Sequence, residues 1–159
     1  MNDADVLARI DELGLELPPP PQAVAAYVPV VISGSVAFVA GQIPMVDGTL
    51  QHPGLVGSEV SVEDAAGAAG RCALQALAAL RADLGSLDRL RRIVQVSVFV
   101  AAAEGFTQHP VVANGASELL VEVLGERGKH ARAAVGVPSL PLGSCVEVAV
   151  IAEVEPSSG

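Results

Sequence analysis

The sequence predicts an α+β fold in which a mixed β-sheet is packed against two helices on one of its faces. Helix and strand patterns alternate only in the middle of the chain, so that a leading helix is followed by the order β-β-α-β-α-β-β. Neither an internal repeat nor a linker divides the 159 residues, and a chain of this length is most simply one domain. We therefore expect a single domain over residues 1–159, with residues 18–154 as its core and residues 1–17 as a helical extension.

Three segments have the residue pattern of helices and glycines at their ends. The first is short, can be capped by Asn2 or Asp3, and stops at Gly14. The second begins at Ser61 in a Ser-x-x-Asp capping pattern. Its body is rich in alanine and glycine, which implies close packing against a sheet. The second and third helices are predicted from Ser61 to Gly85 and from Phe106 to Leu124.

Five segments rich in β-branched residues predict the strands of the sheet. The first two flank Ser-Gly-Ser and indicate a hairpin with a tight turn. The third is apolar nearly throughout, as a buried central strand should be. The predicted strands are Tyr27–Ile32, Val36–Ala40, residues 91–101, Ala131–Val137 and Cys145–Val154, with an extended tetraproline connector at 18–21 and a loop at 41–57.

The composition restricts the partners that the protein can have. Hydrophobic residues make up 51% of the chain and charged residues only 17%, and a sheet with helices on one face must hide its other face, so we expect self-association. The net charge of −9 and the 3% aromatic content argue against nucleic acid. The N-terminus lacks the apolar core of a signal peptide, and no stretch is long and apolar enough for a membrane span, so we expect a cytoplasmic protein.

Cysteine and histidine residues show no metal-ligand spacing. Cys72 lies in a helical pattern and Cys145 in a strand pattern, and there is no Cys-x-x-Cys sequence. We interpret both thiols as reduced core residues and expect neither a metal nor another cofactor.

One basic residue stands out because the chain has only nine lysines and arginines. Arg132 lies at the beginning of a predicted strand, where its guanidinium emerges next to an apolar stretch. The residues alone leave two roles open, a surface ion pair or a receptor for a carboxylate. No phosphate-binding loop, dinucleotide fingerprint or nucleophile elbow is present to decide between them.

Four short motifs in consistent order resemble the Rid family, also called the YjgF family, of reactive-intermediate (enamine/imine) deaminases. They are AGQIP at 40–44, VFV at 98–100 with Phe106 six residues on, ARAAV at 131–135 and VEVAVIAEV at 146–154. The resemblance covers roughly residues 18–154. It implies a chorismate-mutase-like fold and a homotrimer with a ligand cleft at each subunit boundary. It also implies that Arg132 clamps a substrate carboxylate, for which the planar guanidinium fork is suited.

The resemblance assigns further site residues one at a time. Tyr27 fits the family's pocket tyrosine, and Gly41 fits the glycine whose backbone approaches the ligand. Asn114 fits a helix asparagine, although TQHP looks inserted before it, and His109 within that insertion either borders the cleft or lies on the surface. Ala134 replaces a cysteine but keeps its backbone N–H.

Two further differences from the family lie in predicted strands. The serine before GQIP is Ala40, and the acid that holds the attacking water is expected at position 149, where this chain has alanine. Glu147 lies two positions earlier on the same face of the strand, about 6–7 Å away, and either contributes to the site or serves structure only.

The function implied by the resemblance is hydrolysis of 2-imino acids, such as 2-aminoacrylate, to 2-keto acids and ammonia, weakened here by the alanine at position 149. The alternative is a non-catalytic trimer that binds small carboxylate metabolites. A mutase or another hydrolase on the same scaffold is a third hypothesis. Ribonuclease activity fits this acidic chain poorly.

Overall fold

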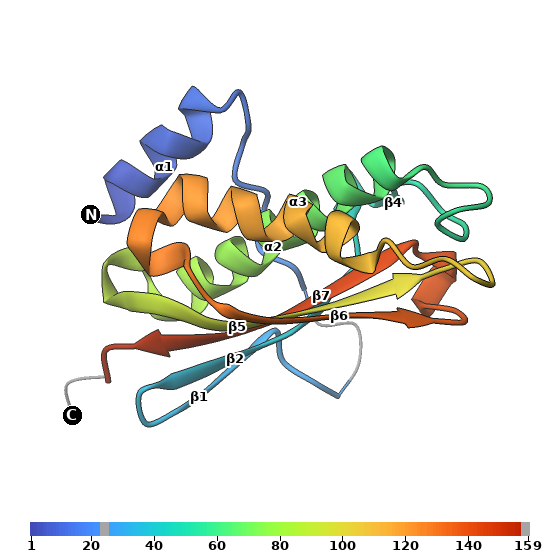
Figure 1. Ribbon diagram of the computed structural model, residues 1–159. Helices are drawn as coiled ribbons and strands as arrows, with labels where there is room; N and C mark the ends of the chain where they lie inside the picture. The colour runs from blue at the N-terminus through green and yellow to red at the C-terminus, as the bar shows by residue number, and fades with distance from the viewer. Residues whose placement is uncertain (23–25, 157–159) are drawn as a thin grey trace.

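A five-stranded sheet with two helices on one face forms the body of the protein. The computed structural model describes residues 1–22 and 26–156. Figure 1 shows α2 (Val62–Leu84) and α3 (His109–Leu124) on the same side of the sheet, with α1 (Asp3–Glu12) lying beyond them. The α+β fold predicted from the sequence is confirmed, including the position of the two helices.

The sheet is mixed because one strand pair is parallel. Its order is β1-β2-β7-β5-β6, and every neighbouring pair is antiparallel except β5 and β6. Helix α3 forms the crossover between these two strands, as a parallel connection requires. β6 is therefore an edge strand with α3 next to it. The five strands are β1 (Val30–Ser33), β2 (Val36–Gln42), β5 (Leu90–Ala101), β6 (Ala131–Val137) and β7 (Val146–Val154).

Two predicted starts are wrong by three residues, and one predicted loop contains regular structure. The first strand begins at Val30 instead of Tyr27, since Pro29 has no N–H and only its carbonyl bonds to β2, accepting from Ala40 N at 2.9 Å. α3 begins at His109 instead of Phe106, because a turn precedes it and Pro110 fits its first turn. The predicted loop at 41–57 contains a small hairpin, β3 (Met45–Val46) and β4 (Thr49–Leu50).

The predicted N-caps of α1 and α2 are confirmed. The Asn2 side chain accepts a hydrogen bond from Asp5 N, and the Asp5 side chain accepts one from Asn2 N, so that α1 begins with a complete capping box. Ser61 Oγ accepts from Asp64 N at 3.0 Å at the start of α2. Gly85 ends that helix with φ of +81°, a conformation that favours glycine.

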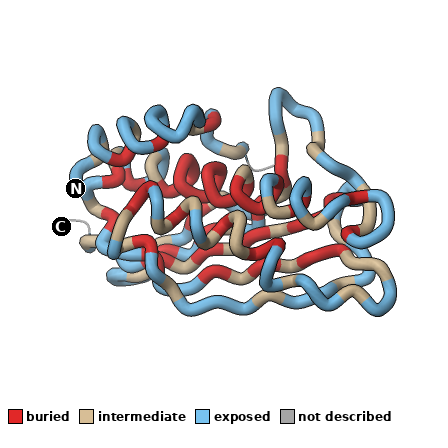
Figure 2. Tube along the Cα trace, turned by 45° about the horizontal axis from the view of Figure 1, so that its top comes forward, coloured by how far each residue is buried: buried red, intermediate tan, exposed pale blue. Residues whose placement is uncertain are grey.

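Burial alternates along the strands and separates the two faces of the sheet. In β7 the even-numbered residues from 146 to 154 are buried under the helices, and the odd-numbered ones are not. Both predicted core cysteines, Cys72 and Cys145, are buried. Figure 2 shows the buried positions gathered where α2 lies over the sheet. The helix-free face bears apolar side chains, and Val31, Phe38 and Val135 are each about half exposed there.

The two helices touch most closely at glycines, as the alanine- and glycine-rich sequence of α2 implied. A β-carbon at Gly115 would collide with the backbone carbonyl of Ala66 in α2, and one at Gly70 would lie 3.2 Å from the Gly115 carbonyl oxygen. The backbones of α2 and α3 are thus in direct contact, and any larger residue at position 115 must separate them.

Substitution of Gly115 by alanine should destabilise the fold. The added methyl meets backbone atoms that cannot rotate away, so we expect Gly115→Ala to lower the free energy of unfolding by about 1–3 kcal/mol. Gly67→Ala is the matched control on α2, because nothing lies within 4 Å of its β-carbon position. There the better helix propensity of alanine should raise stability by about 0.5–1 kcal/mol. Urea unfolding of both variants measures the difference, and equal stabilities would contradict the close contact.

Candidate functional site

The predicted carboxylate receptor lies between α3 and the edge strand β6. Arg132 pairs with Val96, whose side chain is buried under the helices, so Arg132 also projects toward the helical side. Its Nη1 donates to Asn114 Oδ1 at 2.8 Å and to Ser117 Oγ at 3.2 Å, both on α3. The structure thus brings together Arg132 and Asn114, which were predicted separately. It adds Ser117 and His130, whose Nε2 lies 2.9 Å from Ser117 Oγ. We call these four residues the arginine cluster.

The arginine cluster contains no acidic partner. Among residues 1–22 and 26–156, no carboxylate lies within ion-pair distance of Arg132, whereas Arg81 and Arg91 both have one. Arg132 is nevertheless exposed. The observation argues against the surface-ion-pair role that the sequence left open and leaves the guanidinium available to an external anion.

The other helix-facing positions of β6 continue this surface along the strand. Ala134 packs against the core, and Gly136 lies under the imidazole of His109, where a β-carbon would collide with Nε2. Phe106 packs edge-on against that ring, with centroids 5.2 Å apart. His109 therefore lies on the same side of β6 as Arg132 and Ala134, at the opposite end of the strand.

A second cluster of predicted residues lies at β2 and β7. The register of these strands shifts between Val39 and Gln42, and Gly41 in this irregular stretch faces Glu147 so closely that a β-carbon would collide with Oε1. Burial raises the pKa of Glu147. We call Gly41 and Glu147 the glutamate cluster. Ala149, where the acid was expected, pairs with Ser97 in the middle of the sheet.

A cavity of about 220 Å³ lies beside the glutamate cluster. Tyr27 and Gly41 both line it, together with the buried glutamines Gln42 and Gln75, which the sequence did not single out. Gln75 of α2 accepts from Met45 N at 2.9 Å and donates to the Ile43 carbonyl at 2.9 Å, and it also bonds to Gln42. A polar residue within the apolar run CALQALAAL was the signal for this buried amide pair.

A single chain does not bring the two clusters together. Glu147 alternates with Val146 and Val148, which are buried under the helices, and so projects from the opposite face of the sheet. β5 separates β7 from β6 in the strand order. Arg132 and Asn114 therefore share one location, and Gly41, Glu147 and Tyr27 belong to another.

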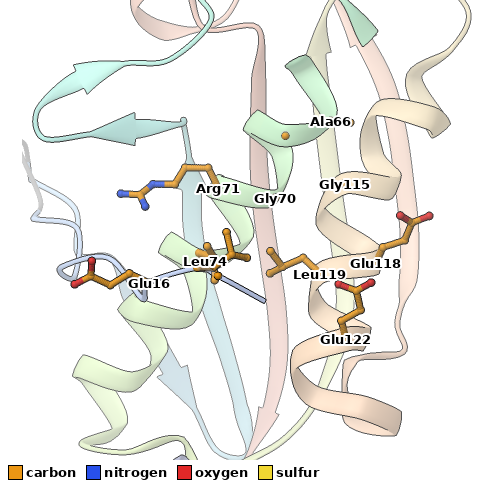
Figure 3. A pocket seen from close by; sticks show the side chains of 12 residues that line it. Glu16, Ala66, Gly70, Arg71, Leu74, Gly115, Glu118, Leu119 and Glu122 are labelled. Carbon is orange, nitrogen blue, oxygen red and sulfur yellow. The ribbon is translucent and has the colours of Figure 1, made fainter. Parts of the chain in front are cut away.

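A larger cavity of about 510 Å³ lies in the helical layer. Figure 3 shows that Glu16, Glu118 and Glu122 line it, and Arg71 is its basic residue. Arg71 Nε already donates to the Met45 carbonyl at 2.9 Å. The three carboxylates would repel an anionic ligand, and the cavity contains none of the site residues predicted from the sequence.

Two other kinds of feature are absent from the part of the chain that the structure describes. It contains no group of three or more His, Cys, Asp or Glu side chains arranged to hold a metal ion. None of its helices has the length and apolar character needed to cross a membrane.

Comparison with known proteins identifies the family. Residues 7–154 match the family described as "YjgF/chorismate mutase-like, putative endoribonuclease". Protein TCP17 of Trypanosoma cruzi is 42% identical, over 93% of each chain. A crystal structure of a protein of unknown function from Agrobacterium tumefaciens is 44% identical and superposes with a TM-score of 0.91, over 96% of this chain and 94% of the other. RidA from a Psychrobacter species is 27% identical with a TM-score of 0.58, over 85% and 94%. The chain belongs to the YjgF/Rid family.

Replacing Glu147 by glutamine should change the pH dependence of stability. Because burial raises the folded-state pKa, the carboxyl stabilises the fold fully below its unfolded pKa, and this contribution is lost as pH rises through the folded value. Glutamine cannot ionise. The melting temperature of Glu147→Gln relative to wild type should therefore increase from about pH 4, near the unfolded pKa, as the pH rises through the raised folded-state pKa of Glu147.

Thermal unfolding at several pH values tests this, with Glu153→Gln as the control because Glu153 is exposed on the same strand. A Glu147→Gln difference that stays constant with pH would mean that burial does not disfavour the carboxylate.

Proposed function

We propose that the protein is a homotrimeric enamine/imine deaminase that hydrolyses small 2-imino acids to 2-keto acids and ammonia. In this proposal Arg132 binds the substrate carboxylate and Glu147 moves the proton. Each site takes its arginine cluster from one subunit and its glutamate cluster from the next. The observation on which it depends is the guanidinium of Arg132, which is held by two neutral oxygens and has no acidic partner among the described residues.

The geometry of Arg132 suits a carboxylate ligand. Asn114 and Ser117 both accept hydrogen bonds from Nη1, so the donors on Nη2 and Nε stay available. Two parallel N–H donors on one edge of a guanidinium match the two oxygens of a carboxylate. Binding there would hold the imine carbon of a short 2-imino acid near the Ala134 backbone.

Glu147 is suited to proton transfer because burial raises its pKa, which makes its carboxylate a stronger base than that of an exposed glutamate. In the reaction Glu147 takes a proton from water as the water oxygen bonds to the imine carbon. The C=N electron pair moves to nitrogen, which receives that proton from Glu147. The hydroxyl of the resulting carbinolamine then gives up its proton, which Glu147 passes to the amine, and ammonia leaves as the C–N bond breaks and the C=O bond of the keto acid forms. Gly41 allows the acid to lie against the β2 backbone. With Glu147 in this role, the reaction needs no acid at position 149.

Assembly into a trimer would cover the exposed apolar face of the sheet and would bring the two clusters together. The helix-free face of the sheet bears exposed Val31, Phe38 and Val135, which association would cover. The arginine and glutamate clusters lie on opposite faces of one sheet, so they can act on a single ligand only if they come from different chains. A closed ring in which each subunit contacts the next supplies such pairs.

The second candidate function is a trimer that binds 2-keto acids without turnover. The alanine at position 149 favours it, because a methyl group cannot accept a hydrogen bond from water. Ribonuclease activity, which the family description names, has little support in a chain with a net charge of −9.

Arg132→Ala should abolish most of the affinity for pyruvate and 2-oxobutanoate. Loss of a charge-assisted bidentate contact should weaken binding by roughly 10- to 150-fold, and Arg132→Lys should also bind poorly because an ammonium lacks the fork. Calorimetric titration measures the affinities. Arg91→Ala is the control, since Arg91 only forms a surface ion pair with Glu155. Unchanged binding by Arg132→Ala would exclude the proposed clamp.

Mixing two inactive variants should restore activity if each site spans two chains. Arg132→Ala inactivates the arginine cluster and Glu147→Gln inactivates the glutamate cluster. In randomly mixed trimers roughly a quarter of the interfaces combine an intact arginine cluster with an intact glutamate cluster. We expect about a quarter of the wild-type rate of keto acid and ammonia release from an enzymatically generated imine. Light scattering should give about three times 16.1 kDa for each variant. Trimers that regain nothing on mixing would contradict a shared site, and an inactive wild type that still binds keto acids would support the binding function.

A further inference from the structure

The residues that hold Arg132 form a longer hydrogen-bonded series that ends on the backbone. Arg132 Nη1 donates to Ser117 Oγ, Ser117 Oγ lies 2.9 Å from His130 Nε2, and His130 Nδ1 lies 2.6 Å from the Gly128 carbonyl oxygen. We propose that Ser117 and His130 are positioning residues for Arg132, which hold its Nη1 edge against the protein and keep its other edge turned toward the ligand. This proposal rests on the proposed role of Arg132.

For a neutral His130 ring, the chemistry of the two ends fixes the direction of every hydrogen bond in the series. Arginine can only donate, and the Gly128 carbonyl can only accept. His130 must therefore bear its proton on Nδ1, which leaves Nε2 of the neutral imidazole as an acceptor. The single hydroxyl proton of Ser117 then points to Nε2, and the Ser117 lone pairs face the guanidinium. Donors and acceptors match at each step from Arg132 to Gly128.

The series is built on rigid backbone. Gly128 is buried in the turn η2 (Gly125–Gly128), where a β-carbon would collide with the Leu120 carbonyl of α3. The Gly128 carbonyl is thus fixed by direct packing of the turn on α3. Ser117 also lies on α3, and His130 precedes Arg132 by two residues. The series therefore joins the helix, the turn and the edge strand at the point where the guanidinium emerges.

The matching of donors has a consequence for the ligand. Because the Ser117 proton is used by His130, the Ser117 lone pairs stay directed at Nη1 of Arg132, and the hydroxyl does not turn toward the ligand carboxylate or another acceptor. Without an acceptor at position 130 the hydroxyl is free to rotate, and one of the two bonds that hold Nη1 weakens. Arg132 then samples more side-chain conformations, and the ligand must select one of them.

The test is a set of variants titrated with pyruvate and 2-oxobutanoate. Ser117→Ala and His130→Ala should each weaken binding by about 3- to 15-fold, the effect of one neutral hydrogen bond. His130→Gln places an amide oxygen near the Nε2 position and should recover part of this loss. His130→Asn keeps only a group near Nδ1 and should behave like His130→Ala. Ser117→Thr retains the hydroxyl and should bind better than Ser117→Ala.

A double-variant comparison separates positioning from general structural support. If both residues act through Arg132, Ser117→Ala should cause no further loss of affinity in the Arg132→Ala background. Lys129→Ala is the control, since Lys129 adjoins His130 but pairs with Glu126 on the surface. Equal losses with and without Arg132, or His130→Asn binding as well as wild type, would overturn the proposal.

Nitrogen NMR of His130 tests the series independently of any ligand. We expect the neutral tautomer protonated on Nδ1, and a ring protonated on Nε2 would overturn the assigned directions. A wild-type protein that binds no keto acid, or an Arg132→Ala variant that binds normally, would reject the proposed function itself. In that case the tautomer alone decides whether the hydrogen-bonded series exists.

Discussion

The backbone contact between Gly115 of α3 and Ala66 of α2 determines where the rest of the helical layer lies. Because no side chain separates the two helices there, α3 has a fixed height and rotation above the sheet. Asn114 precedes Gly115 directly, and Ser117 follows two residues later. The same contact that packs the helices therefore also positions Asn114 and Ser117, the two acceptors of Arg132. A change in the packing of α2 against α3 would also move the guanidinium of Arg132.

The parallel pairing of β5 and β6 has an equally direct effect on the site. Two parallel strands need a crossover connection, and α3 is the crossover between β5 and β6. The helix therefore lies beside the edge strand β6. Arg132 is the second residue of β6 and lies within reach of α3 for this reason. An antiparallel hairpin at the same edge would have presented Arg132 to solvent with no helix beside it.

Local signals predicted the starts of α1 and α2, because a cap acts within a few residues, whereas α3 has no side-chain cap and begins three residues later than predicted. Asn2 and Ser61 identify the starts of α1 and α2 without any knowledge of the fold. Strand limits depend on partners far away in the chain, which explains why the start of β1 and the β3–β4 hairpin were missed. In the same way, the sequence resemblance located Arg132 and Asn114 separately, whereas the contact of Gly41 with Glu147 depends on a register shift between β2 and β7. His130 had no signal, since a lone histidine gives no indication of its hydrogen-bond partner.

The separation of Arg132 and Glu147 on opposite faces of the sheet also limits how the two can act together. A guanidinium close to Glu147 would lower the pKa of its carboxyl, whereas burial now raises it. In the proposed assembled site the two groups would therefore have to stay far enough apart for the carboxyl to keep the proton-transfer role that we propose for it. A short 2-imino acid would meet this requirement, because its carboxylate would neutralise Arg132 while its imine carbon lay nearer the acid. The substrate would thus act as the spacer between the two charged groups, and a site of this kind would favour small acids whose two functional ends match that gap.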